Sequence, residues 1–236
     1  MLKTVQQALF STGLQLPKWE PVENKATDYE VRKYEATKWA STKVVGMELD
    51  PAISKGFTRL FNYIQGNNEK KVKIEMTVPV TCLVDPGAGP FCETTFTTSF
   101  YIPEEHQADP VKPSDPDVFI EQRPELTVFV RRKLRSNWLT EAQQSIRVTE
   151  YYIVICCFCC CILTQVLHFR VFGGFTNAQK AQGELIKLSQ SLQRDGQQFE
   201  ENVYYTAGYD SPFKLFNRKN EVWLIKKTGE DVKTEA

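Results

Sequence analysis

The sequence predicts an α+β domain built from two similar halves, in each of which two strands, one helix and two further strands follow one another. Two observations support this prediction. Short segments rich in β-branched and aromatic residues occur in pairs on both sides of two segments with apolar residues at helical spacing. A proline-rich stretch, 103–116, separates the two sets. We therefore expect a curved antiparallel sheet or barrel with both helices packed outside it.

In the first half, four segments have strand character: 28–34, 36–46, 71–84 and 93–102. A helix is expected between the second and the third of them. Asp50 is suited to cap this helix, Pro51 to occupy its first turn and Gly66 to end it. Its apolar side is one stripe, formed by Ile53, Phe57, Leu60, Phe61 and Ile64.

The second half repeats this order, with strands at 117–124, 125–131, 203–212 and 221–227. Its helix is predicted to start at Thr176, which forms a capping box with Gln179, and to end near Asp195 and Gly196. The apolar stripe of this helix consists of Ala181, Leu185, Leu188 and Leu192. Outside the two halves we expect a short amphipathic arm at 1–16 and a flexible tail at 229–236.

Composition excludes several classes of protein. The chain has 236 residues with 29 basic and 29 acidic side chains, so it lacks the positive charge that a nucleic-acid-binding protein needs. Seven cysteines, most of them crowded into 156–161, do not form the spaced pattern of a disulfide framework or a zinc site. We infer a reducing intracellular compartment, the cytoplasm, with association with mitochondria as an alternative location.

Several unusual runs of sequence resemble the SOUL heme-binding protein family. In chain order they are YEVRKYEATKWAST, GFTRLFNYIQGNNEKKVKIEMTVPV, FGGF, YYTAGYDSPFKLFNR and NEVWLIKK. The resemblance covers 17–131 and 171–228. It implies a single domain over 17–228 whose duplicated halves form a distorted eight-stranded antiparallel barrel with two main helices and internal pseudo-twofold symmetry.

The family pattern is interrupted at 132–170, a segment whose composition differs from its surroundings. We interpret it as an insertion that is a retained intron or an error of the gene model, and it could contain an extra helix. Its unbroken apolar run, 151–163, would reach about 20 Å as a helix, short of the roughly 30 Å of a bilayer core. We therefore favour a loop that buries its apolar residues over membrane contact through 151–167.

The chain carries no catalytic motif of the kinds HExxH, GxSxG or a Gly-rich phosphate loop, so we expect a non-enzymatic binding protein. The resemblance implies that the cofactor is heme or another tetrapyrrole, bound beside the first helix. Four apolar residues would wall the site: Phe57, Leu60, Phe61 and Ile64. Three cations would face the propionates: Lys55, Arg59 and Lys214. The alternative is that the apolar stripe is only part of the core.

The axial ligand is the point at which this chain departs from the family pattern. Lys33 stands where the resemblance implies a histidine that coordinates the iron. A protonated lysine is a poor metal ligand, and an exposed lysine stays protonated at neutral pH. We therefore predict no metal ligand at this position and hydrophobic binding of the macrocycle, and the sequence assigns no other residue as the axial ligand.

A second function is an alternative: a protein-interaction module in cell death or mitochondrial-permeability regulation, with apoptosis regulators as partners. The resemblance implies a binding motif in the second helix, where Leu185, Leu188, Leu192 and Phe199 would anchor a partner groove and Asp195 would pair with a cation. The same leucines are expected in the core of the domain, so they would be available only if the helix detached.

Overall fold

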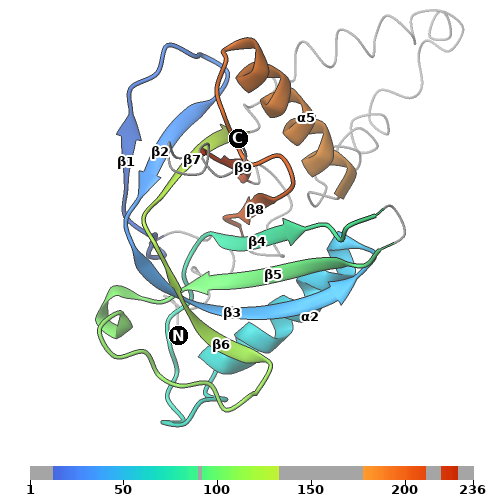
Figure 1. Cartoon of the computed structure of the whole chain (residues 1–236). Helices are drawn as coiled ribbons and strands as arrows, with labels where there is room; N and C mark the ends of the chain where they lie inside the picture. Colours follow the sequence, from blue (N-terminus) through green and yellow to red (C-terminus); the bar gives the residue numbers. More distant parts are fainter. Residues whose placement is uncertain (1–12, 90–91, 133–177, 211–218, 228–236) are drawn as a thin grey trace, which may run out of the picture.

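The structure, a computed structural model, describes residues 13–89, 92–132, 178–210 and 219–227 (Figure 1). Its strands are β1 (Trp19–Val22), β2 (Glu30–Tyr34), β3 (Thr37–Gly46), β4 (Val80–Asp85), β5 (Thr94–Tyr101), β6 (Val118–Arg123), β7 (Leu126–Arg132), β8 (Tyr204–Gly208) and β9 (Asn220–Ile225). Its helices are α2 (Leu49–Ile64), α5 (Ala178–Arg194) and the short 3-10 helix η1 (Glu104–His106). Predictions for Thr176, the FGGF run and 132–170 concern residues that lie mostly or wholly outside these ranges.

The strands form one curled antiparallel sheet in the order β1-β2-β7-β9-β8-β4-β5-β3-β6. The β4–β8 pair lies at the centre of the order β2-β7-β9-β8-β4-β5-β3-β6. Outward from this pair, the strands are β8, β9, β7 and β2 on one side and β4, β5, β3 and β6 on the other. Strands at equal distance from the centre, such as β9 and β5, occupy the same position in their two ββαββ halves. The sheet therefore has a pseudo-twofold axis between β4 and β8. This topology confirms the duplicated halves.

The sheet has nine strands among the described residues, one more than predicted. The additional strand, β1, pairs with β2 in the register that places Trp19 opposite Tyr34. Sequence reasoning missed it because its four residues, WEPV, are all exposed and lack a period-two alternation. β1 extends one edge of the sheet beyond the symmetric eight strands.

Two predicted boundaries were wrong. The strand expected over 71–84 begins only at Val80, directly after Pro79, which has no N–H to donate to a neighbouring strand. The first helix begins at Leu49 with Glu48 in the cap position, so Asp50 lies in the first turn, where its charge favours the helix dipole. Gly66, with φ of +115°, follows the end of α2 as predicted.

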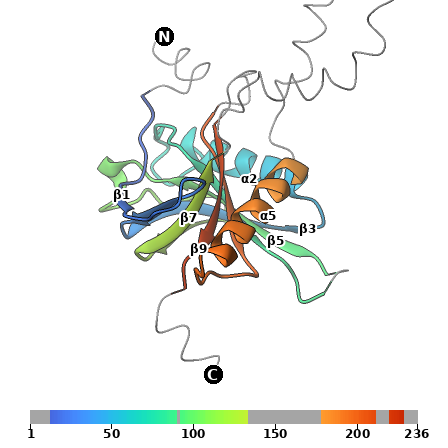
Figure 2. The same cartoon turned by 90° about the horizontal axis from the view of Figure 1, so that it is seen from above.

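Each helix covers its own half of the sheet, as Figures 1 and 2 show. α2 packs on β3 and β5, and α5 packs on β7 and β9. The core under α2 contains Ala40, Leu60, Tyr63, Ile64, Phe100 and Val118. The core under α5 contains Val31, Phe129, Leu188, Leu192, Val222 and Leu224. These two clusters fix the helices and therefore decide which helical side chains remain at the surface.

A buried arginine repeats in the two halves of the sheet. Arg32 on β2 is 1% exposed, and its guanidinium carbon lies 4.4 Å from the centre of the Trp19 ring. Arg123 on β6 is 8% exposed and lies 4.2 Å from the centre of the Trp39 ring. Each follows a glutamate by two positions, and each forms an ion pair with that glutamate. The duplication therefore extends to a Glu-x-Arg motif.

Candidate functional site

The predicted apolar stripe of α2 divides into a buried part and a surface part. Leu60 is fully buried and Ile64 is 4% exposed, so both belong to the core under α2. Phe57 is half-buried and Phe61 is 41% exposed. The rings of Phe57 and Phe61 stack with 5.8 Å between their centres and 13° between their planes. We call this pair, of which Phe61 is the exposed member, the aromatic step.

The aromatic step rests on the sheet through Phe57, whose ring meets Phe100 of β5 edge to face with 5.3 Å between ring centres. Phe57 is held on its inner side by this contact, whereas Phe61 has an open outer side. A flat apolar ligand can therefore be covered on one face by the step without any opening of the core. Met76 is partly buried against the same cluster as Phe100.

The predicted propionate cations do not gather at the aromatic step. Arg59 is two residues from both Phe57 and Phe61, which places it about 200° around the helix, on the other flank. There it forms an ion pair with Asp117 and donates a hydrogen bond to the carbonyl of Lys43 over 3.2 Å. Lys55 is exposed on α2, and Lys214 lies outside the described residues. The structure thus separates Arg59 from the aromatic pair.

Lys33 lies on β2, whose neighbours are β1 and β7, whereas α2 packs on β3, β5 and β6. Its ammonium group is 2.9 Å from a carboxylate oxygen of Glu125, and both side chains are about half exposed. The hydrogen bond and the charge of Glu125 raise the pKa of Lys33 above its ordinary value. The amine therefore holds its proton and has no lone pair to offer a metal.

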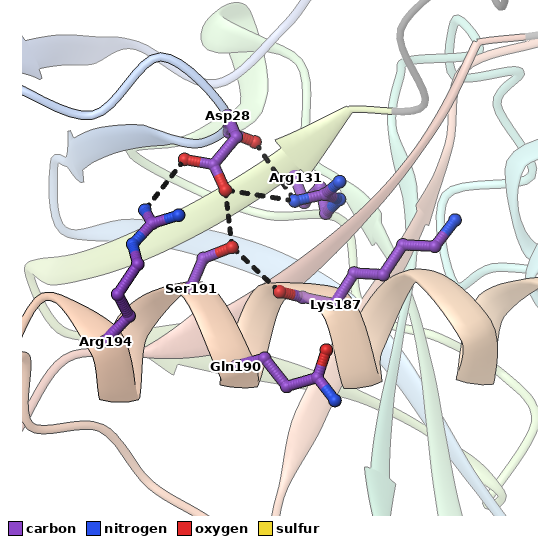
Figure 3. Close-up of a pocket in the computed structure, with 6 residues that line it drawn as sticks. All are labelled: Asp28, Arg131, Lys187, Gln190, Ser191 and Arg194. Atoms are coloured by element: carbon purple, nitrogen blue, oxygen red, sulfur yellow. Dashed lines mark hydrogen bonds and ion pairs between the residues drawn. The ribbon is translucent and has the colours of Figure 1, made fainter.

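A hollow of about 300 Å³ lies on α5, and none of the residues of the predicted partner motif lines it (Figure 3). Its lining is Asp28, Arg131, Lys187, Gln190, Ser191 and Arg194. The carboxylate of Asp28 is at its centre and accepts hydrogen bonds from Ser191 over 2.5 Å and from Arg194 over 3.3 Å. Arg131 forms an ion pair with the same carboxylate over 3.5 Å. These bonds lower the pKa of Asp28, with Ser191 as the main cause.

A second, larger hollow of about 770 Å³ adjoins the first and shares Asp28 and Arg194 with it. It lies between the end of α5 and the loop that joins β1 to β2, and we call it the α5 groove. Its lining is Val22, Glu23, Asn24, Lys25, Ala26, Thr27, Asp28, Tyr29, Val31, Arg194, Asp195, Gln197 and Lys226. Of the residues in the predicted partner motif, only Asp195 lines this groove. The groove itself could not be predicted from the sequence, because its two sides are more than 160 residues apart along the chain.

The apolar residues of the alternative partner motif lie in the core or pack against it, whereas Asp195 is exposed. Leu188 and Leu192 are fully buried, Leu185 is partly buried and Phe199 is 7% exposed. Asp195 accepts hydrogen bonds from the Tyr29 hydroxyl over 3.1 Å and from Arg194. A partner could reach these leucines only after α5 left the sheet.

The described residues contain no group of histidine, cysteine and acidic side chains arranged to hold a metal ion, and no helix among them is long and apolar enough to span a membrane. Cys82 is buried, and burial raises the pKa of its thiol to about 12, which makes it a poor nucleophile. Cys92 is exposed.

The fold and the site define a class of protein: two ββαββ halves share one curled sheet, and a helix on its outer face presents a stacked aromatic pair to solvent. The model of the SOUL heme-binding protein family matches residues 14–143 and 162–225, which is most of the chain. The chain belongs to this family. The unmatched residues 144–161 fall inside the predicted insertion.

Curated relatives agree with the family match. The chain is 45% identical over 218 residues to human "Heme-binding protein 2", covering 91% of this chain and 87% of the relative. It is 27% identical over 229 residues to mouse "Heme-binding protein 1", covering 96% and 100%. Among solved structures, the EcmrR C-terminal domain matches 89% of this chain and 99% of its own length with a TM-score of 0.52. At 7% identity, this last match shows a shared fold only.

Proposed function

We propose that this protein binds heme or a related tetrapyrrole on the aromatic step of α2, without catalysis. The observation that carries the proposal is the exposed, stacked pair of Phe57 and Phe61 in a chain of the SOUL family. A tetrapyrrole is a flat aromatic ring, and offset stacking on aromatic side chains is a favourable arrangement for such a ring. The relatives reported above are named heme-binding proteins 1 and 2, which supports the same ligand class.

Phe57 and Phe61 suit the macrocycle, whereas Lys33 does not suit the iron. Phe57 and Phe61 offer an apolar face, but Lys33 is protonated and paired with Glu125. Bound heme would supply the iron chemistry, and this chain would supply the surface that removes one face of the ring from water. Covering about 300 Å² of apolar surface contributes about 7 kcal/mol. Association costs several kcal/mol, so we expect a micromolar or weaker dissociation constant.

Titration of hemin and of iron-free protoporphyrin IX into the full chain, followed by absorbance, tests the proposal. Phe61→Ser removes the exposed ring and should raise both dissociation constants by about tenfold, the equivalent of 1.4 kcal/mol. Ile186→Ser is the matched control because Ile186 is a 51%-exposed apolar residue on the other helix. Equal affinities for the two variants would contradict binding at the step.

Position 33, where the family resemblance implies a histidine, provides a second variant for the same titration. Lys33→His should leave the Soret band and the hemin affinity unchanged, because β2 is not among the strands on which α2 packs. A shifted Soret band in that variant alone would place the iron at β2 and would overturn the proposed location.

A further inference from the structure

The strand β6 lies at one end of the sheet and pairs only with β3 (Figure 1). A hydrogen bond at the start of β3 shows which backbone groups of β3 point toward β6. The Ile102 N–H donates to the carbonyl of Lys38 over 3.3 Å, so the backbone groups of Lys38 point toward β5. Those of the next residue, Trp39, therefore point toward β6 and meet those of its partner Glu121.

The backbone groups at the outer edge of β6 belong to alternate residues. Since those of Glu121 point toward β3, those of Val118, Ile120 and Gln122 point away from it. The Val118 N–H donates to the carbonyl of Asp115 over 3.1 Å, which agrees with this direction. The N–H and C=O groups of Ile120 and Gln122 have no hydrogen-bond partner in the part of the chain that the structure describes. The side chain of Gln122 is exposed, so solvent reaches this edge.

The other half of the sheet shows what suits such an edge. The pseudo-twofold axis relates β6 to β2, and the outer edge of β2 is covered by β1 in an antiparallel pair. Among the described strands, none takes the corresponding place beside β6. An extended segment would therefore find beside β6 a position equivalent to that of β1.

The free edge of β1, at the opposite end of the sheet, is closed to a further strand. The Glu35 N–H donates to the carbonyl of Lys18 over 3.3 Å, so the backbone groups of Trp19 and Pro21 point outward. Pro21 has no N–H to donate there. Of the two ends of the described sheet, β6 is thus the one that can accept another strand. The matching edge that a second copy of the chain offers is its own β6.

The sequence of β6 can pair with itself. In an antiparallel pair centred on Ile120, the N–H and C=O of Ile120 meet those of the same residue in the second copy. Each Gln122 N–H meets the carbonyl of Val118 in the other copy. Pro116 and Pro124 are equally distant from Ile120, so both lie outside the paired residues.

Charge favours this register over its neighbours. A pair centred on Glu121 would place two carboxylates directly opposite each other, and one centred on Phe119 would place Asp117 opposite Glu121. Like charges in directly opposite positions destabilise a strand pair. The pair centred on Ile120 places Asp117 opposite Arg123 of the second copy. Both of these side chains form ion pairs within their own copy, so this register avoids repulsion without needing a new ion pair.

We propose that two copies of the chain pair through the outer edges of β6, antiparallel and centred on Ile120, and so form one continuous sheet across a twofold axis. The paired stretch is short, so the dimer is weak. The proposal does not depend on tetrapyrrole binding, because the aromatic step rests on Phe100 of β5.

Sedimentation velocity of the full chain under reducing conditions tests this proposal. The weight-average mass of the wild type should rise from that of one chain toward that of two between about 5 and 500 µM. Gln122→Pro removes an outward N–H, as Pro21 does in β1, and should keep the mass of one chain throughout. Gln122→Thr is the matched control, because it keeps the N–H and should behave as the wild type does.

Amide exchange on the wild type tests the same contact without relying on the folding of Gln122→Pro. The N–H groups of Ile120 and Gln122 should exchange at least about threefold more slowly at the high concentration than at the low one. The N–H of Trp19, at the closed edge, should exchange at the same rate at both.

Three results would overturn the proposal. The first is a wild type that keeps the mass of one chain at the highest concentration. The second is exchange at Ile120 and Gln122 that does not depend on concentration. The third is a folded Gln122→Pro variant that still forms dimers, because another surface would then hold the two copies together.

Discussion

Replacing Glu221 with glutamine should remove the charge that the buried Arg32 requires. The Glu221 carboxylate is fully buried at the side chain and accepts from Arg32 over 3.0 and 3.2 Å. The Tyr209 hydroxyl and the Trp223 indole N–H also donate to it, over 2.7 and 3.0 Å. An amide at this position keeps the shape of the side chain but places an NH₂ donor among groups that are themselves donors.

The expected loss of folding stability in Glu221→Gln follows from the burial of both charges, those of Arg32 and Glu221. Removing one partner of a buried ion pair costs 3–5 kcal/mol because the other charge remains without compensation. Arg32 retains Glu30, whose side chain is 48% exposed, so its charge is partly balanced in the variant. We therefore expect a loss at the lower end, about 3 kcal/mol.

Urea unfolding measures this loss. With an m value of about 2 kcal/mol per molar urea, the midpoint of the Glu221→Gln variant should fall by about 1.5 M. Glu30→Gln is the control, since an exposed partner contributes at most about 1 kcal/mol. The paired change Arg32→Met with Glu221→Leu should lose less than Glu221→Gln alone, because it leaves no unpaired charge.

The pH dependence gives an independent check. Burial by itself would raise the pKa of Glu221, but the charge of Arg32 and the hydrogen bonds hold it below the ordinary value of 4.5. A lowered folded pKa contributes stability that is complete above the ordinary value and is lost as the pH falls through the folded one. The difference between wild type and Glu221→Gln should thus be full at pH 7 and shrink in acid. A loss below about 1 kcal/mol at pH 7, or a difference that grows in acid, would refute the reasoning.

Two other predictions concern the helices. A Cβ at Gly56 would lie 2.5 Å from Oγ1 and 2.8 Å from Cβ of Thr98, whereas nothing lies within 4 Å of a Cβ at Gly183. In thermal melts, Gly56→Ala should therefore lower the free energy of unfolding by about 2 kcal/mol, and Gly183→Ala should raise it by about 0.5–1 kcal/mol. Equal shifts in the two variants would show that α2 does not lie so close to β5. Leu192→Ala should lose about 3 kcal/mol in urea unfolding, and an unchanged midpoint would remove Leu192 from the core.

Much of the fold could be predicted from local pattern. Alternation of apolar and polar residues located the eight symmetric strands, and helical spacing located α2 and α5, because both periods arise within a few residues of chain. β1 could not be found in this way, since its four exposed residues gain their structure from pairing with β2. The late start of β4, by contrast, has a local cause, because Pro79 has no N–H to donate to a neighbouring strand.

In the candidate site, too, the local sequence pattern predicted some features and tertiary packing decided the others. Helical spacing placed Phe57, Leu60, Phe61 and Ile64 in one stripe, but it could not say which of them the sheet would cover. Packing of α2 on β3 and β5 buried Leu60 and Ile64 and left Phe61 at the surface. Arg59, which the sequence grouped with these residues, was turned to Asp117 on the other flank.

By itself the sequence determined the duplicated order of elements, the two helical stripes and the family resemblance, because each is a property of neighbouring residues. Only the tertiary structure decided the buried pair of Arg32 with Glu221, the cluster around Asp28 and the α5 groove. Their members lie more than 100 residues apart along the chain. Such groups meet only when the sheet places β2 and β9 on either side of β7 and packs α5 beside them, and no local pattern records that meeting.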